Sequence, residues 1–540
     1  MLNEDSNPSL DEDDESSIMN LFLDPAGDNL DDFEDALIKS LKLLKLWWKG
    51  QGDNSPPRPS EDEVRILVQK MEDQTKSSPF TPTYKQLESC IATLFRNMRF
   101  NKNNLINVHP SPILPAVLAS LLTMLQNPNN LSSSTSAATT FMEEECICEL
   151  ASLVGFSGST KGASCRGNIV SCGTISNLTG LTVAREKAYR KSLNSEADFN
   201  KKFGLFGSPR GVILTTKSAH YSIRKTTRIL GLGDDGLIEV PVACEDEVTE
   251  FDKSGKPFKL KPSTQVYAET LENVKRSRRK TDGEDSIIIS AVATLGTINT
   301  GTIEPIQPLV GLRDEYGFHL HVDAAIGGLA LGLDEVKKKA SGVEVADSIT
   351  IDPHKLGFIQ YPCSAILFRN DSDLDFLATD VPYVDSCAST IEGSRPGSSA
   401  AGFWVALKTL GRDGYNRIIG RCISLTKTLG NLLNDAGYQV LHEVDLNTVC
   451  FALKKEREPR KKLNRLTSEL QNRVTAKGKY LTGKVDDVSG IMVKDRPWQN
   501  SSEKVSLTGI RVWIMNPQID EHDLELLIGE LNERRKQLTF

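Results

Sequence analysis

Residues 318–328 read F-H-L-H-V-D-A-A-I-G-G and residues 346–357 read A-D-S-I-T-I-D-P-H-K-L-G, and these two stretches decide the fold. Each begins as a short apolar strand and ends in polar residues. Asp323 closes the first strand, and Lys355 stands in the tetrad that follows the second. In open α/β sheets, ligands bind outside the carboxyl ends of the strands. The two stretches therefore predict one site that holds a carboxylate and an amine.

An amine and a carboxylate at neighbouring strand ends suit one kind of cofactor chemistry. A lysine can hold a carbonyl cofactor as a Schiff base, and an aspartate can keep a pyridinium nitrogen protonated. Two other interpretations stay open from these residues alone. His319, His321 and Asp323 alternate along the strand, a spacing that suits a metal. The tetrad D-P-H-K also fits a plain turn, because proline stops a strand.

Length and composition indicate a globular protein of ordinary type. A chain of 540 residues has room for two or three domains, and its 39% hydrophobic and 25% charged content is typical of globular proteins. The first 38 residues hold thirteen acidic side chains and no Lys or Arg, so the remainder is slightly basic. No basic tract is visible. This charge distribution argues against nucleic acid as the main ligand.

Targeting signals and cysteines favour the cytoplasm. The N-terminus is acidic, unlike a signal peptide, and the longest apolar run, residues 113–125, is too short to span a bilayer. Ten scattered cysteines fit a reducing compartment, and Cys146 and Cys148 are too close for a typical metal pair. We expect a cytoplasmic protein with no membrane span and no metal site.

Strand and helix patterns alternate through the middle of the chain. Apolar strands are expected at 168–172, 211–215 and 286–295, followed by the two strands quoted above. This alternation predicts an α/β fold with a mainly parallel sheet and right-handed crossovers. After Gly414 the pattern changes to that of a smaller α+β domain. The expected domains are an acidic disordered head and linker at 1–60, an N-terminal helical segment at 61–150, a large domain at 151–414 and a small C-terminal domain at 415–540.

Two glycine-containing segments have contrasting interpretations. The expected strand 168–172 leads into G-T-I-S-N-L-T-G-L and then a helix, an order that aims free backbone amides at an anion. An ordinary helix N-cap at Thr174 or Ser176 fits the same residues. G-L-G-D-D-G at 231–236 matches a dinucleotide pattern, but a helix precedes it and a strand follows. That is the reverse of the required order, so we interpret the segment as a helix end and turn.

Taken together, the motifs resemble a known family. H-V-D-A-A, D-P-H-K and G-T-I-S-N occur in the order and spacing of the group II pyridoxal-phosphate-dependent amino-acid decarboxylases, which have the aspartate-aminotransferase fold. The resemblance covers roughly residues 80–540. T-I-D-P-H-K-L-G-F-I-Q-Y-P-C, I-E-G-S-R-P-G-S-S-A-A and S-S-S-T-S-A-A-T-T-F-M-E are most similar to the bacterial tyrosine decarboxylase branch, and S-R-P-G also resembles glutamate decarboxylases. The resemblance implies pyridoxal 5'-phosphate as cofactor and a homodimer with shared active sites.

The resemblance also implies roles for single residues. Lys355 would hold the cofactor, Asp323 would pair with its pyridine nitrogen, and His220 and Ala325 would pack on the two faces of its ring. The other implied cofactor contacts are Thr174, the backbone of Ile175, Ser176, Thr294, His354 and Ser394, the last reaching a phosphate in the partner subunit. Asp352 replaces the Asn of other branches, so we assign it no phosphate contact.

Catalysis and substrate binding involve three further residues by the same resemblance. Tyr383 would protonate Cα, although a packed aromatic fits its position nearly as well. His109 and Arg395 would contact the substrate. Residues 108–114, similar to a substrate-lining loop, carry apolar groups and one His but no Arg or Lys. Arg395 would suit an acidic substrate, but its segment crosses between subunits, where a structural ion pair is equally plausible.

The leading expectation is therefore α-decarboxylation of an L-amino acid, tyrosine or another aromatic one, to the amine and carbon dioxide. Three alternatives remain. The substrate could be aspartate or glutamate; the enzyme could be a carbon–carbon lyase or an aldehyde-forming relative; or the chain could be a non-catalytic scaffold of the same fold. The presence of both Lys355 and Asp323 argues against the scaffold.

Overall fold

The computed structural model describes residues 102–156, 167–192, 204–205, 208–279, 286–378, 389–476, 480–499 and 502–539, with five positions between 34 and 42. The chain divides into two compact units, one comprising Met1–Asn104 and Thr475–Leu481 and the other Leu105–Val474 and Thr482–Phe540. Nearly all described residues belong to the second unit. Most of the predicted acidic head and linker, residues 61–101 of the predicted N-terminal helical segment and Tyr383 lie outside the described residues.

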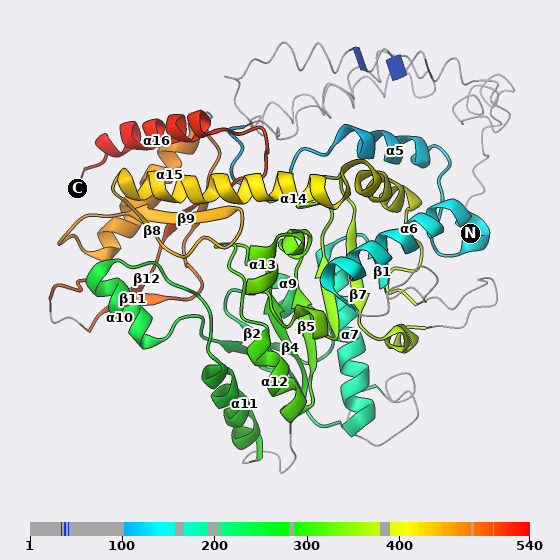
Figure 1. The fold of residues 1–540 in the computed structure, drawn as a ribbon. Coiled ribbons are helices and arrows are strands. Elements are labelled where there is room, and N and C mark those ends of the chain that lie inside the picture. Colours follow the sequence, from blue (N-terminus) through cyan, green and yellow to red (C-terminus); the bar gives the residue numbers. More distant parts are fainter. Residues whose placement is uncertain are drawn as a thin grey trace, which may run out of the picture. The chain divides into compact units, whose positions relative to one another are not determined.

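The described residues of the second unit contain a seven-stranded sheet in the order β1-β7-β6-β5-β4-β2-β3 (Figure 1). Its strands are β1 Gly167–Val170, β2 Gly211–Thr216, β3 Leu237–Val240, β4 Ile287–Thr294, β5 His319–Asp323, β6 Ser348–Ile351 and β7 Ser364–Phe368. From β3 to β6 all pairs are parallel, as predicted. Only β7 runs antiparallel to its neighbours, because it follows β6 through a connection without a crossover helix.

The strands are continuous apolar runs because helices cover the sheet. The polar exceptions on β5 are His319, His321 and Asp323, which share one face because side chains alternate along a strand. Helix α7 (Gly173–Ser192) packs across β4, β5, β6 and β7. At Gly180 an added Cβ would lie 2.8 Å from the His321 ring, so the helix approaches this face closely only because glycine stands there.

The other helices of the described part lie around this sheet and in the C-terminal region (Figure 1). They are α5 Leu114–Met124, α6 Ser133–Val154, α9 Tyr221–Ile229, α10 Glu245–Ser254, α11 Thr264–Arg279, α12 Gln307–Tyr316, α13 Asp334–Lys339, α14 Gly397–Asp435, α15 Arg460–Ala476 and α16 Glu521–Lys536. Helix α14 packs on α5 and α6 and also on the strands that follow it. It kinks at Gly411, where φ is +58°. The predicted boundary at Gly414 thus falls inside this helix, and the domain limits stay predictions.

The residues after α14 form a smaller α+β region. Its antiparallel sheet has the order β10-β13-β9-β8 among the described strands. The bounds are β8 Tyr438–Val440, β9 Thr448–Leu453, β10 Gly483–Val485 and β13 Gly509–Trp513, with β11 Met492–Lys494 and β12 Lys504–Ser506 forming a separate ribbon. The segment G-L-G-D-D-G follows the end of α9 and leads through a short 3₁₀ turn into β3, which confirms its interpretation as a helix end and turn.

Among the described residues, no helix is both long and apolar enough to cross a bilayer.

Candidate active site

A cavity of about 240 Å³ lies at the carboxyl ends of β4, β5 and β6. Seven of the sequence-predicted residues line it: Thr174, His220, Thr294, Asp323, Ala325, His354 and Lys355. The other described lining residues are Val108, Cys172, Gly173, Asn177, Tyr221, Gly296, Ile298, Ile326, Asp352 and Tyr361. The strand-end argument therefore brings together residues that are far apart in the sequence.

Lys355 forms a buried ion pair with Asp352 at the floor of this cavity. Its Nζ lies 3.0 Å from Asp352 Oδ2, and the Asp352 side chain is almost fully buried. Burial alone would lower the pKa of Lys355, but the carboxylates of Asp352 and Asp323 outweigh burial and raise it. Burial likewise opposes ionisation of Asp352, yet Lys355 and His354 hold the pKa of Asp352 well below its usual range. Both partners are thus charged.

His354 has a defined orientation beside this pair. The backbone N–H of Cys363 donates to His354 Nδ1 at 3.3 Å, so the ring proton is on Nε2, which lies 3.4 Å from Asp352 Oδ2. The ring stacks on Tyr361 with a centroid separation of 3.9 Å. The Ser364 hydroxyl donates to Asp352 Oδ1 at 2.5 Å. Asp352 is therefore held by three neighbours and is part of the cavity wall.

The first turn of α7 borders the same cavity. The amides of Gly173 and Thr174 have no intrahelical partner, because a helix leaves its first N–H groups free. The amide of Ile175 donates to Cys172 O at 3.0 Å. The Ser176 hydroxyl is fully buried and bonds Ser364 Oγ at 2.7 Å. The free donors of this turn, the amides of Gly173 and Thr174, therefore lie two residues before the expected contacts Ile175 and Ser176.

Asp323 is held by two donors. Asn177 Nδ2 donates to Asp323 Oδ2 at 2.9 Å, and the Ala325 amide donates to Oδ1 at 3.2 Å. Asn177 was quoted in the motif G-T-I-S-N but received no role from the sequence. Its position one helical turn after Gly173 was the available signal, because residues four apart share a helix face.

His220 caps α9 and also faces the cavity. Its Nδ1 lies 2.8 Å from the Ser222 hydroxyl and accepts the Ser222 amide at 3.3 Å. Burial lowers the pKa of His220, and the nearby Asp323 carboxylate only partly offsets this effect. The ring is therefore neutral near pH 7 and presents a flat face beside the cavity.

Besides Ile175 and Ser176, three predicted residues of the described part lie outside the cavity lining: His109, Arg395 and Ser394. His109 contacts the edge of Tyr361, with ring centroids 5.7 Å apart. Arg395 is buried in an ion pair with Glu143 and donates to Ile169 O at 2.6 Å and Asn130 O at 2.7 Å. The expected role of Arg395 as a substrate cation is therefore not met, because its guanidinium is used within the fold.

Ser394 is exposed and accepts a hydrogen bond from Asn129 Nδ2 at 3.1 Å. It does not line the cavity of its own chain.

The donor set fits pyridoxal phosphate better than a metal. An amine, a buried carboxylate and free first-turn amides face one cavity, which matches a carbonyl, a ring nitrogen and a phosphate. The metal interpretation of β5 fails on its own residues, since His319 and His321 both bond the Ser348 hydroxyl. Within the described part of the chain, no cluster of His, Cys, Asp or Glu is arranged to hold an ion.

Comparison with known proteins gives an independent result. Residues 85–454 match the model of the pyridoxal-dependent decarboxylase conserved domain. A probable L-tyrosine/L-aspartate decarboxylase from Methanothermobacter thermautotrophicus is 33% identical over 294 residues, which is 53% of this chain and 67% of the relative. An acidic amino acid decarboxylase from Homo sapiens is 25% identical, covering 88% of this chain and 85% of the relative.

Solved structures show the same fold at low sequence identity. Oryza sativa TDC with PLP and tryptamine superposes with a TM-score of 0.77 at 19% identity, covering 95% of this chain and 99% of that one. Mouse CSAD gives a TM-score of 0.76 at 21% identity, with 95% and 100% covered. These similarities confirm the predicted aspartate-aminotransferase-like fold.

Proposed function

The chain belongs to the pyridoxal-dependent decarboxylase family and is a carboxy-lyase for amino acids that uses pyridoxal phosphate, and from this premise we propose that its substrate is an aromatic L-amino acid, tyrosine first. The products are the amine and carbon dioxide. The observation that carries the substrate choice is the lining of the cavity. Among its described residues Lys355 is the only Lys or Arg, whereas Val108, Ile298 and Ile326 are apolar.

The proposed roles follow from the positions of the side chains. Lys355 supplies the amine that holds the cofactor, and Asp352 keeps this amine charged until it is needed. Asp323 holds a proton on the ring nitrogen. Gly173 and Thr174 bind the phosphate through the α7 amides. When bound, pyridoxal phosphate supplies an electron-poor ring that accepts the electron pair left by the departing carboxylate.

Two further roles complete the proposal. The neutral His220 ring packs flat on one side of the cofactor, and Ala325 leaves space on the other because its side chain is a single methyl group. Tyr383 remains the proposed donor of the proton to Cα, and it lies outside the described residues.

Aspartate is the second candidate substrate, because the relative that is 33% identical is named for both tyrosine and aspartate. An acidic side chain needs a cation facing its distal carboxylate, whereas an aromatic ring needs apolar walls. Comparing carbon dioxide release from tyrosine, aspartate and glutamate by the purified holoenzyme tests the choice. We expect turnover of tyrosine to exceed the others by about tenfold or more. Activity confined to aspartate and glutamate would overturn the aromatic assignment.

A matched pair of variants sharpens this test. Ile298→Arg introduces a cation into the cavity wall, so tyrosine turnover should fall about tenfold while aspartate turnover rises relative to it. Ile229→Arg makes the same change on α9, where the side chain is 58% exposed, and should change neither rate. Equal effects of both variants would show that the wall does not select the substrate.

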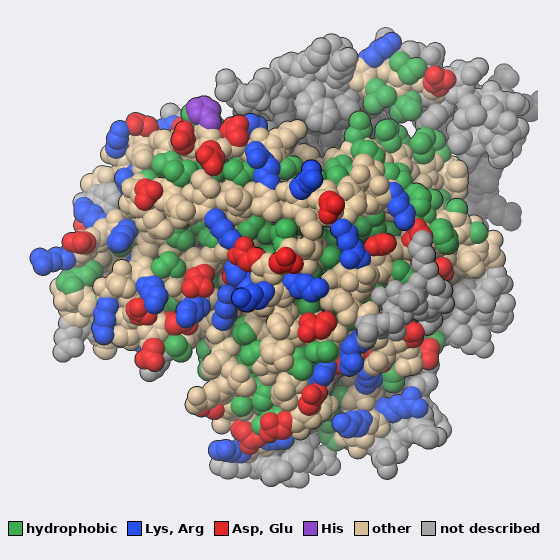
Figure 2. All heavy atoms as spheres, in the orientation of Figure 1, with side chains coloured by type: hydrophobic (Ala, Val, Ile, Leu, Met, Phe, Trp, Pro, Cys, Tyr) green, Lys and Arg blue, Asp and Glu red, His purple; other side chains and the backbone are tan. Residues whose placement is uncertain are grey.

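We also propose that the enzyme is a cytoplasmic homodimer. Leu114, Leu118 and Leu122 are 67%, 48% and 62% exposed and form one stripe along α5, where Figure 2 shows hydrophobic side chains gathered. Such a stripe suits burial against a second copy. The cysteines of the described segments are all free, which agrees with a reducing compartment.

Leu122→Glu should shift the dimer toward monomer in light scattering, whereas Met492→Glu, at an exposed site on β11, should not. A dimer unchanged by Leu122→Glu would place the interface elsewhere.

A further inference from the structure

Asn177 is the branch point of a buried hydrogen-bond chain beneath the cavity. Its Nδ2 donates to Asp323 Oδ2 at 2.9 Å and to Ser222 Oγ at 3.0 Å. Since Ser222 Oγ accepts from Asn177, its own proton is free for His220 Nδ1 at 2.8 Å. One amide group therefore reaches both Asp323 and His220, the two residues assigned to the ring nitrogen and the ring face.

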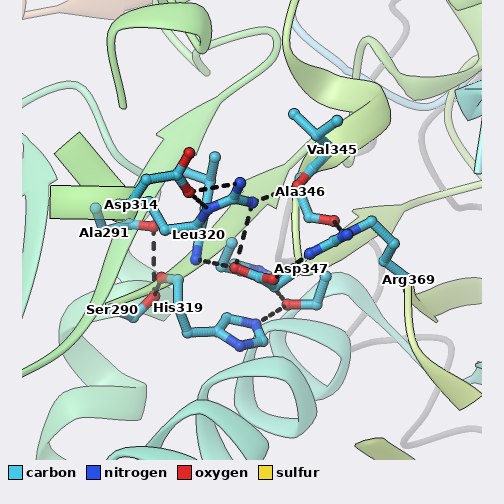
Figure 3. Close-up of polar contacts among 12 residues, drawn as sticks. Ser290, Ala291, Asp314, His319, Leu320, Val345, Ala346, Asp347 and Arg369 are labelled. Carbon is cyan, nitrogen blue, oxygen red and sulfur yellow. Dashed lines mark hydrogen bonds and ion pairs between the residues drawn. The ribbon is translucent and has the colours of Figure 1, made fainter. Parts of the chain in front are cut away.

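The other end of the amide leads away from the cavity along β5. Asn177 Oδ1 lies 3.0 Å from His321 Nε2, and His321 Nδ1 lies 2.8 Å from Ser348 Oγ. The same hydroxyl lies 2.7 Å from His319 Nε2. Figure 3 shows the His319 end of this hydrogen-bond chain, beside the ion pairs of Asp347. The chain thus crosses the α7-facing side of the sheet.

Every hydrogen bond in this chain has a fixed direction. An ionised Asp323 only accepts, so Asn177 must turn Nδ2 toward it and Oδ1 toward His321. His321 Nε2 must then carry a proton. Burial lowers the pKa of His321 to about 3, so the ring is neutral and its Nδ1 accepts from Ser348. Ser348 in turn accepts from His319 Nε2, whose pKa burial also lowers to about 3.

The members of this hydrogen-bond chain are buried, so water cannot replace any of their partners. Asn177, His321, Ser348 and Ser222 are at most 1% exposed. An added Cβ on Gly180 would lie 2.8 Å from the His321 ring and 3.2 Å from Ser348 Oγ, so α7 closes the chain off. A buried polar group without a partner is costly, so each member holds the next in one orientation.

We propose that Asn177 is a positioning residue that, through this chain, orients Asp323 as an acceptor for the ring nitrogen and fixes the ring tautomer of His220. The inference rests on the proposed function for its two targets. His321 and Ser348 act through Asn177 by holding its amide in one orientation. Neither touches the cavity, and neither needs to change its protonation state during turnover.

The titratable groups facing Asp323 define what a pH measurement reports. They are Lys355 and Asp352 after β6, Glu304 near β4, His220 before α9 and His321 on β5. Removing the Asn177 donor leaves Asp323 with one hydrogen bond fewer to its charged form. The carboxylate then competes more strongly for the ring-nitrogen proton.

The first experiment measures cofactor affinity and the visible absorption band of the holoenzyme between about pH 6 and pH 9. Asn177→Leu removes the amide, and Asn177→Asp keeps its shape but removes its donors. We expect both variants to bind pyridoxal phosphate about 10- to 100-fold more weakly and to show a band that changes with pH. Thr179→Val is the control, because Thr179 is buried on α7 and its hydroxyl, among the described residues, bonds only Ile175 O.

The outcomes separate a donor role from simple packing. Wild-type behaviour of both Asn177 variants would overturn the proposal. So would a defect in Asn177→Leu alone, because Asn177→Asp preserves the packing. A wild-type chain that binds no pyridoxal phosphate would instead overturn the proposed function.

The second experiment needs no cofactor. Nitrogen-15 labelling of the seven histidines, with His321 assigned from the signal lost in His321→Gln, reports the ring tautomer in the full chain. We expect the Nε2–H form with no titration between about pH 6 and pH 9 in wild type, and a mixture of tautomers in Asn177→Leu. A wild-type His321 that titrates near 6.5, or carries its proton on Nδ1, would contradict the proposed hydrogen-bond chain.

Discussion

The main sheet has a buried carboxylate beside cations at each end of its strands, and we propose chemistry at only one of these two edges. At the cofactor edge Asp352 pairs with Lys355 at 3.0 Å. At the opposite edge Asp347 pairs with Arg369 at 3.0 Å and lies 3.8 Å from Arg313 (Figure 3). An arginine cannot lose its proton in a protein, whereas a lysine can. The identity of the cation therefore separates a structural pair from a reactive one.

The environments of the two carboxylates agree with this difference. Asp347 Oδ2 also accepts from the Leu320 amide at 2.8 Å, so the cluster ties the start of β6 to β5. A cleft of about 650 Å³ lies at this edge, lined in part by Lys187, Arg190 and Lys191. It is larger than the cofactor cavity. Cavity size alone would thus select this edge, whereas the amine of Lys355 supports the proposed site at the other edge.

Replacing the lysine of the Asp352 pair should have the largest effect on turnover. Lys355→Arg keeps a positive charge beside Asp352 but removes the nucleophilic amine, so turnover should fall on the order of 10⁴-fold while the fold survives. Carbon dioxide release and circular dichroism measure the two properties. Borohydride reduction and peptide mapping of wild type should place the pyridoxyl group on Lys355.

Arg369→Lys is the matched exchange at the opposite edge and should leave turnover within about twofold. If Lys355→Arg retained a tenth of the activity, or the label mapped to another lysine, the contrast between the edges would be wrong.

Removing the carboxylate of the structural pair should cost stability instead of activity. Asp347→Asn leaves two arginines beside a neutral group, so the free energy of unfolding should fall by about 3–4 kcal/mol at pH 7. Burial opposes ionisation of Asp347, but His319, the Leu320 amide and the arginines lower its pKa overall. Its contribution is therefore present above about pH 4 and is lost as the pH falls through the lowered value.

Urea unfolding at several pH values measures this effect, and the difference between wild type and variant should shrink in acid. Asp314→Asn is the control, since Asp314 is exposed and its pair with Arg313 should contribute less than about 1 kcal/mol. A loss of turnover without a loss of stability in Asp347→Asn would contradict the assignment of this edge as structural.

Asp323→Asn tests the reactive edge without touching the amine. An amide does not keep the ring nitrogen protonated, so turnover should fall about a hundredfold while cofactor remains bound. The ratio of bound cofactor to protein and the rate at saturating substrate separate the two quantities. A near-normal rate would mean that Asp323 has another role.

The strand ends at the cofactor edge were predictable because their signals in the sequence are local. The strands ending at Asp323 and Ile351 were expected within one residue, and the D-P-H-K tetrad directly follows the second. Residue pairings distant in sequence were not predictable. Arg395 with Glu143 and Ser176 with Ser364 depend on how α6, α7 and β7 meet. The sequence made no prediction for the direction of β7 for the same reason, since strand pairing is not encoded in an apolar run.

A third buried carboxylate gives the smallest expected effect. Glu304 is fully buried, accepts from Thr216 Oγ1 at 2.5 Å and from the Thr294 amide at 2.8 Å, and pairs with no Lys or Arg among the described residues. Burial raises its pKa to about 7. The unfolded chain releases this proton near pH 4.3, so between about pH 4.3 and pH 7 the folded state binds more protons and stability falls as pH rises.

Glu304→Gln removes this dependence of stability on pH. Allowing about 1 kcal/mol for weaker acceptance by an amide, the variant should be about 3 kcal/mol more stable than wild type at pH 8 and no more stable at pH 4. Thermal unfolding across this range measures the difference, and a variant that is less stable at pH 8 would show that Glu304, like Asp347, is held as an anion.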